Sequence, residues 1–168
     1  MKGLILVVPI VFALAAVVVI LGFTQIRLDA LQKPGHVETV FATQAKHLLV
    51  RWNSREGIPL PPTNLQASIE EGDKLYGIEC GMCHGPDGHT ATDTGRWMYP
   101  RASDLTSAAV QQYSDRELFW IVKNGIRLTG MPAFGRVESD EHIWNLAHYV
   151  RSLRGSAPAG TAAERLWP

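Results

Sequence analysis

The chain has 168 residues, and its 16 lysine and arginine residues balance its 16 aspartate and glutamate residues, so the formal net charge at pH 7 is zero. Nucleic-acid binding depends largely on an excess of positive charge, and we therefore expect no nucleic-acid partner. Cysteine occurs only twice, at Cys80 and Cys83, which excludes a zinc site built from two cysteine pairs.

The chain begins with a strongly apolar segment. No charged residue occurs from Gly3 to Phe23, and this length matches the roughly 20 residues that a helix needs to cross the hydrocarbon core of a bilayer. The alternative is a cleaved secretory signal, because an Ala-Leu-Ala triplet at 13–15 resembles a cleavage site. The apolar run continues beyond that triplet, and we predict a transmembrane anchor over residues 1–23.

Residues 24–67 are predicted to form an amphipathic stalk and a proline-rich spacer. After Pro34-Gly35, apolar residues recur at helical spacing, which predicts a helix with one apolar stripe. We expect this stripe to lie either against protein, as a cover of the globular domain or of a partner subunit, or on the membrane surface. Three prolines within four positions predict an extended spacer over 54–66. The stripe consists of Val37, Val40, Phe41, Ala45, Leu48, Leu49 and Trp52.

The globular domain is predicted over residues 68–155, followed by a loose tail at 156–168. Ser68 is followed by Glu70 and Glu71, and this pattern is typical of an N-cap with acidic residues in the first turn. It predicts a first helix that begins at Ser68 and runs up to Cys80. Residues 85–107 are rich in turn-forming residues and show no periodicity, which predicts a long loop.

Two further helices are predicted in the same domain. Ser114 and Glu117 form a capping box at the start of one helix, and Gly125 closes it. The last helix begins at Ser139, presents a complete apolar face and stops at Gly155. Every regular element predicted for this domain is a helix, and we predict an all-α fold.

Both cysteines fall in the pentad Cys80-Gly81-Met82-Cys83-His84. A redox dithiol, a zinc site and covalent haem attachment all use two cysteines at this spacing. Zinc would need a further ligand pair, and a thioredoxin-like dithiol needs a βαβ context. The pentad Cys-x-x-Cys-His is the haem attachment signature, in which two thiols add across the vinyl groups and the histidine binds the iron. We therefore predict one covalently attached haem c, with a structural disulfide or redox pair as the alternative.

At this point the sequence resembles a family, the small single-haem cytochromes c of class I. The resemblance covers about Ser68 to Gly155 and is carried by the pentad, by NGIRLTGMPAFG at 124–135 and by SDEHIWNLAHYVRSLRG at 139–155. It implies a class I cytochrome c fold, with three main helices around a covalently bound haem. It also implies that the first helix crosses the last one closely, through Gly72 and Tyr76 against Leu146 and Tyr149.

The resemblance further implies the ligands of the iron. In this family a methionine before a proline is the distal ligand, and Met131-Pro132 fits; Met98 is the alternative. The cofactor-binding residues are then Cys80, Cys83, His84 and Met131, and the iron ligands are His84 and Met131. A proline carbonyl commonly orients the proximal histidine, but Pro100 stands five residues before Leu105 and Ser103 stands two before it, so the orienting carbonyl stays open.

Two axial ligands leave no open position on the iron, which favours one-electron transfer over bond making. We therefore predict an electron carrier rather than an enzyme, with no small-molecule substrate. Its donor and acceptor would be a redox protein or subunits of a respiratory or photosynthetic membrane complex. Haem attachment places the domain on the periplasmic side of the bacterial inner membrane, with a single-pass anchor. The alternative is a haem sensor or peroxidase-like enzyme with an exchangeable sixth ligand.

The charge of the predicted domain affects whether long-range electrostatics can steer it toward a redox partner. Residues 68–155 carry nine lysine and arginine residues against twelve aspartate and glutamate residues. Long-range steering by a basic ring is therefore not expected. A membrane tether would reduce the need for it, because it confines the domain near its partner.

Overall fold

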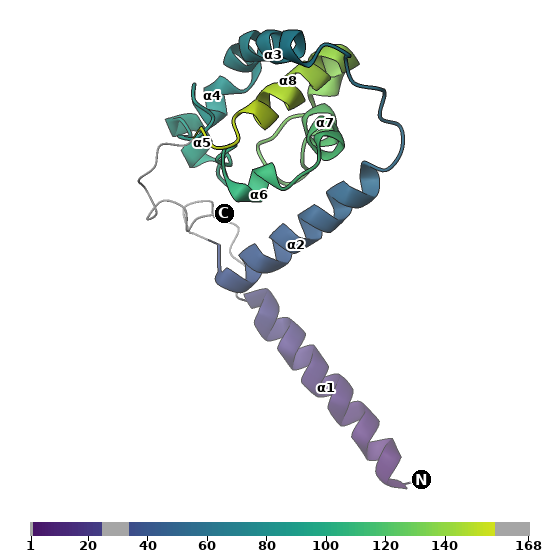
Figure 1. Cartoon of the computed structure of the whole chain (residues 1–168). Helices are drawn as coiled ribbons and strands as arrows, with labels where there is room; N and C mark the ends of the chain where they lie inside the picture. Colours follow the sequence, from purple (N-terminus) through teal and green to yellow (C-terminus); the bar gives the residue numbers. More distant parts are fainter. Residues whose placement is uncertain (1, 25–33, 157–168) are drawn as a thin grey trace. The chain divides into compact units, whose positions relative to one another are not determined.

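The structure is a computed structural model that describes residues 2–24 and 34–156. It divides the chain into two compact units, residues 1–33 and residues 34–168. Within the described residues every regular element is a helix and none is a strand (Figure 1). The all-α fold class predicted from the sequence is therefore confirmed, whereas the predicted tail beyond residue 156 lies outside the described residues.

The first unit contains helix α1, which spans Lys2–Thr24 and includes Pro9. Among the residues that the structure describes, no helix meets the combined length and hydropathy expected of a membrane span. The transmembrane anchor over residues 1–23 therefore stays a prediction.

The second unit begins with helix α2, His36–Asn53. The predicted helix after Pro34-Gly35 is thus present, and its N-terminus is capped by the Glu38 carboxylate, which accepts a hydrogen bond from the Gly35 backbone at 3.3 Å. Near its other end, Val50 is only 3% exposed and belongs to the core of the domain. The C-terminal part of α2 is therefore packed against the globular domain.

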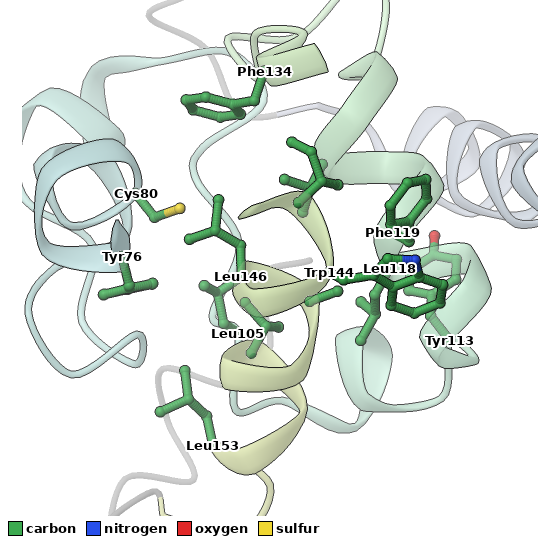
Figure 2. Packing of buried hydrophobic residues seen from close by; sticks show 14 of the residues in the cluster. Tyr76, Cys80, Leu105, Tyr113, Leu118, Phe119, Phe134, Trp144, Leu146 and Leu153 are labelled. Atoms are coloured by element: carbon green, nitrogen blue, oxygen red, sulfur yellow. The ribbon is translucent and has the colours of Figure 1, made fainter. Parts of the chain in front are cut away.

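Helices of the domain surround one hydrophobic core (Figures 1 and 2). In chain order the described elements are α3 (Leu65–Glu79), α4 (Gly81–His84), α5 (Asp93–Trp97), α6 (Ala108–Gln111), α7 (Asp115–Asn124), the 3-10 helix η1 (Phe134–Arg136) and α8 (Asp140–Ser152). Helix α8 packs on both α3 and α7. The three main helices of the domain are thus α3, α7 and α8, with α8 in contact with the other two. This arrangement agrees with the cytochrome c fold that the resemblance implies.

The start of α3 differs from the prediction. The helix begins at Leu65, where the side chain of Asn64 accepts a hydrogen bond from the Ala67 backbone at 3.1 Å. Ser68, predicted as the N-cap, lies inside the helix and is buried, and its hydroxyl donates to Asn145 at 2.5 Å. The prediction was wrong because Asn and Ser are both good N-caps. The Ser68 hydroxyl is bonded to Asn145 of α8 and does not cap the helix.

The predicted caps of the other two long helices are confirmed. Ser114 and Glu117 form the reciprocal capping box of α7, and Gly125 ends the helix with φ +65°. The hydroxyl of Ser139 accepts from the His142 backbone at the start of α8. The long loop predicted over 85–107, in contrast, contains the short helix α5, which the Thr92 side chain caps. A helix of five residues is too short to show periodicity in the sequence.

The crossing of α3 and α8 follows the expected pattern. Gly72 packs so closely on α8 that a Cβ at this position would overlap the backbone carbonyl of Asn145. The ring of Tyr76 lies 5.0 Å from that of Tyr149. Leu146 is fully buried, and Figure 2 shows it in the same core as Tyr76. The glycine therefore lets the two backbones approach, as the resemblance implied, and its nearest neighbours on α8 are the Asn145 carbonyl and the Cβ of Tyr149.

Candidate functional site

The cysteine pentad occupies the junction between α3 and α4. Cys80 is the C-cap of α3. Its carbonyl accepts hydrogen bonds from the backbone N–H groups of Cys83 at 3.0 Å and His84 at 2.9 Å. These bonds wind the pentad into one helical turn, and Gly85 ends it with φ +78°. The turn therefore fixes the spacing of the two thiols and places His84 directly after them.

The thiol of Cys80 faces the core. The residue is 7% exposed, and Figure 2 shows its sulfur pointing toward Leu146 of α8, with Phe134 reaching in from η1. Burial raises the pKa of the Cys80 thiol to about 12. A thiol that stays protonated at neutral pH is a poor redox nucleophile. In addition, the described residues contain no group of three or more His, Cys, Asp or Glu side chains placed to hold a metal ion.

The imidazole of His84 is held by one hydrogen bond. Its Nδ1 lies 2.8 Å from the backbone carbonyl oxygen of Ser103, which can only accept, so Nδ1 carries the proton and Nε2 keeps its lone pair. Burial lowers the pKa of His84, against the opposing effect of the Ser103 carbonyl. A neutral imidazole with a free Nε2 is the form that binds iron. The orienting carbonyl, left open between Pro100 and Ser103 by the sequence, is that of Ser103.

Residues from α3 and from the segment after His84 hold the pentad in place. The Tyr76 hydroxyl donates to the Gly85 carbonyl at 2.7 Å, and the Thr92 hydroxyl donates to the Met82 carbonyl at 2.6 Å. Gly95 of α5 packs so closely that a Cβ would overlap the carbonyl of Cys83. The chain after His84 thus folds back over the pentad. No sequence signal identified Gly95, since its partner is twelve residues away.

Met131 lies in the tight loop between α7 and η1. Its backbone N–H donates to the Thr129 hydroxyl at 3.1 Å, and its carbonyl accepts from Ile126 at 3.3 Å. The side chain is partly buried and packs against the same hydrophobic core that contains Cys80. The fold therefore brings Met131 and Cys80 to one core although they are 51 positions apart in the sequence.

The second candidate thioether borders the same loop. The side chain of Met98 lies against Gly130, where a Cβ would overlap its sulfur. Glycine at this position therefore leaves room for Met98 beside the Met131 loop. Both methionines that the sequence offered as distal ligands are thus associated with one loop, and sequence spacing gave no indication of this contact.

These donors fit a haem c. One helical turn presents two thiols, the histidine after them has a free Nε2, and a thioether packs on the core from the opposite loop. This set suits a covalently attached porphyrin.

Comparison with known proteins identifies relatives. Residues 67–150, half of the chain, match the protein family described as cytochrome c oxidase, cbb3-type, subunit III. The cbb3-type cytochrome c oxidase subunit FixP of Azorhizobium caulinodans is 32% identical over 123 residues, which cover 66% of this chain and 38% of that protein. The chain therefore spans about two-fifths of the length of this relative.

Two solved structures are also similar. The Kuenenia stuttgartiensis reducing HAO-like protein complex Kustc0457/Kustc0458 matches with a TM-score of 0.54 and 27% identity, over 59% of this chain and 49% of that chain. The KustC0563 c-type cytochrome matches with a TM-score of 0.44 and 30% identity, over 49% of this chain and 96% of that chain.

The helical fold, the pentad and the matches to cbb3-type oxidase subunits define the chain as a c-type cytochrome, and its cofactor is covalently bound haem c. Within that class, the chain belongs to the family of cbb3-type cytochrome c oxidase subunit III.

Proposed function

We propose that this chain is a membrane-tethered electron-transfer cytochrome c that passes single electrons through a His/Met-ligated haem. Its partners would be the subunits of a respiratory membrane complex, as donor and acceptor. The observation that carries this proposal is the hydrogen bond from His84 Nδ1 to the Ser103 carbonyl. It presents Nε2 of an imidazole directly behind two thiols, which is the arrangement that an attached haem requires.

The roles of the residues follow from their chemistry. Cys80 and Cys83 would hold the haem by two thioether bonds, and His84 and Met131 would bind the iron. When bound, the haem supplies a centre that gains and loses one electron. A thioether is a weakly basic, neutral ligand that favours ferrous iron, so Met131 would raise the reduction potential. Two protein ligands would exclude substrate from the iron.

The membrane tether is the second part of the proposal. It is supported by the uncharged segment from Gly3 to Phe23, which lies within the helix of Lys2–Thr24. A single-pass anchor in the bacterial inner membrane would leave the haem domain on the periplasmic side, where c-type haem is attached. The FixP relative is named as a subunit of a cbb3-type cytochrome c oxidase. Similarity to this subunit supports a place for the present chain in a respiratory complex.

Replacing the two methionines separately tests the electron-carrier assignment. Met131→Ala is expected to keep the covalent haem, to lose the weak red charge-transfer band of an iron–thioether bond, to lower the reduction potential and to bind carbon monoxide. Met98→Ala is the matched control and is expected to keep the band and to exclude carbon monoxide. The band should be recorded in the oxidised holoprotein and carbon monoxide binding in the reduced one.

Two results would contradict the assignment. Loss of the band in Met98→Ala with an intact band in Met131→Ala would make Met98 the distal ligand. Ready binding of carbon monoxide by the unaltered protein would instead favour the haem sensor or peroxidase-like enzyme, because it would show an exchangeable sixth ligand.

A further inference from the structure

Helix α2 uses its less apolar side to contact the haem domain. His47 stacks on the ring of Tyr113 with 4.5 Å between the ring centroids, Val50 is buried in the core, and the Ser54 carbonyl accepts from Arg116 at 3.4 Å. Positions 47, 50 and 54 lie on one side of a helix. The side of α2 that packs on protein is therefore not the apolar stripe seen in the sequence.

The stripe lies on the opposite side and is exposed. Val37, Phe41, Leu48 and Trp52 follow one another at spacings of four, seven and four residues, and they are 81%, 76%, 67% and 65% exposed. Val40 and Leu49 flank them and are also exposed, at 47% and 59%. These large apolar side chains form one continuous face, which we call the outer face of α2. A contiguous apolar face of this kind marks an interaction site.

The pattern of the outer face fits a lipid surface better than a second helix. A partner helix in a coiled coil packs along a narrow apolar seam with a period of 3.5 residues. Starting at Val37 and Phe41, such a seam would next require Gln44, then Leu48, then Arg51, so polar residues interrupt it. The outer face is instead broad, because Val40 and Leu49 widen it on both sides. A broad apolar arc with polar flanks is typical of helices that lie in a membrane interface.

The C-terminal end of the outer face has the chemistry of a headgroup contact. Trp52 is exposed, and the guanidinium of Arg55 lies 4.7 Å from its ring centroid. Tryptophan and arginine side chains are typical of the membrane interface, where an apolar body meets a charged or polar head. From residue 36 to residue 55 the chain carries three lysine and arginine residues and one glutamate. Arg51 already pairs with Glu117 of α7 at 3.6 Å, so Arg55 beside Trp52 is the cation of this end that complements anionic lipid headgroups.

The chain length between the two helices is consistent with such a contact. Eleven residues separate Thr24, the end of α1, from His36, the start of α2. A chain of this length spans at most about 40 Å. If α1 crosses the membrane as proposed above, α2 must begin within that distance of the bilayer surface.

We propose that α2 lies on the periplasmic surface of the bilayer, with its outer face at the boundary between lipid headgroups and acyl chains. Because its other side is packed on α7 and on Tyr113, the helix would join the haem domain to the membrane in one orientation. The domain would then meet its redox partner with a fixed face and would not rotate freely on a tether. This inference rests on the proposed membrane anchor, and the experiment below separates the two.

Thiol labelling in lipid nanodiscs tests the proposal. The full-length holoprotein is placed in discs of phosphatidylcholine and phosphatidylglycerol, one copy in each disc, and Phe41→Cys is treated with a hydrophilic maleimide that shifts the band on a gel. Covalent haem occupies both native cysteines, so only the introduced thiol reacts. Gln66→Cys, at an exposed position of α3, is the matched control. Leu14→Cys reports on α1.

We expect Phe41→Cys to react at least about tenfold more slowly than Gln66→Cys, because a thiol at the acyl boundary does not ionise readily. Leu48→Cys should behave in the same way and serves as a second probe of the outer face. An unchanged haem absorption spectrum shows that each variant is folded, and equal labelling after denaturation shows that each thiol is intact.

The outcomes separate the possible occupants. Equal labelling rates at Phe41, Leu48 and Gln66, with slow labelling at Leu14, would overturn the surface contact and leave the anchor in place. Fast labelling at Leu14 would overturn the anchor, while the rates at Phe41 and Leu48 would still decide the surface contact. Protection that occurs only in discs with two copies would assign the outer face to a second copy of the chain and overturn the proposal.

Discussion

Gly72 of α3 lies directly against the backbone carbonyl of Asn145 of α8. At this position even a methyl group would overlap the carbonyl, and the Cβ of Tyr149 would be 2.9 Å away. Two backbones therefore meet without side chains between them. This contact sets the distance between the helices that carry Cys80 and Leu146, and so it controls the position of the pentad relative to the core.

Gly72→Ala is expected to destabilise the domain by about 1–3 kcal/mol, because neither backbone can move away without disturbing the crossing. Gly77→Ala, in the same helix, has open space at its Cβ and should stabilise the fold by about 0.5–1 kcal/mol through helix propensity. Denaturant unfolding of the holoprotein in detergent measures both changes. A destabilising effect of equal size in the two variants would show that the close crossing is not the cause.

The packing of α2 on the domain predicts an effect of Val50. Val50→Ala removes two methyl groups from a site that is 3% exposed and is expected to lower the free energy of unfolding by about 1–3 kcal/mol. Val137→Ala is the matched control at 76% exposure, with an expected change within about 0.5 kcal/mol. If Val50→Ala were as mild as its control in denaturant unfolding, the domain would not depend on α2.

Buried His148 predicts a dependence of stability on pH. Its Nδ1 lies 2.8 Å from the Ser68 hydroxyl, and burial lowers its pKa, although the charge of Asp115 opposes this shift. Below the ordinary histidine pKa of about 6.5, the unfolded chain binds a proton that the folded chain does not. The contribution of His148 to stability is therefore complete above that pH and is lost as the pH falls toward the lower folded pKa.

His148→Gln keeps a polar side chain near Ser68 and removes the titration. The difference between the free energies of unfolding at pH 7 and pH 5 is therefore expected to be smaller in this variant than in the unaltered protein. Urea unfolding at the two pH values measures it. An equal loss of stability in both proteins would assign the acid sensitivity to other groups.

The pentad predicts how the haem is retained. The double change Cys80→Ala and Cys83→Ala is expected to leave no haem on the protein after extraction with acidic acetone, because no thioether bond remains. Met82→Ala, inside the same pentad at 66% exposure, should keep the covalent haem and serves as control. Haem that stayed on the doubly substituted protein after extraction would refute attachment through these cysteines.

Local sequence was enough to predict most of the helices. The capping box of Ser114 and Glu117, the glycine at 125 and the cap at Ser139 all act between neighbours in the chain, so they identified α7 and α8 without knowledge of the fold. The pentad likewise contains its thiols and imidazole within five residues. The N-terminus of α3 was missed because Asn64 and Ser68 are both competent caps, and only contact with α8 distinguishes them.

The rest was decided by tertiary structure, because it depends on contacts between residues far apart in the chain. The Ser103 carbonyl was one of two open candidates until the loop after α4 placed it 2.8 Å from His84. The contact of Met98 with Gly130 joins two loops that no spacing relates. Periodicity identified the apolar stripe of α2 correctly, but a helical pattern does not specify which side of the helix packs on the domain. The burial of Val50 on the domain turned Phe41 and Trp52 outward.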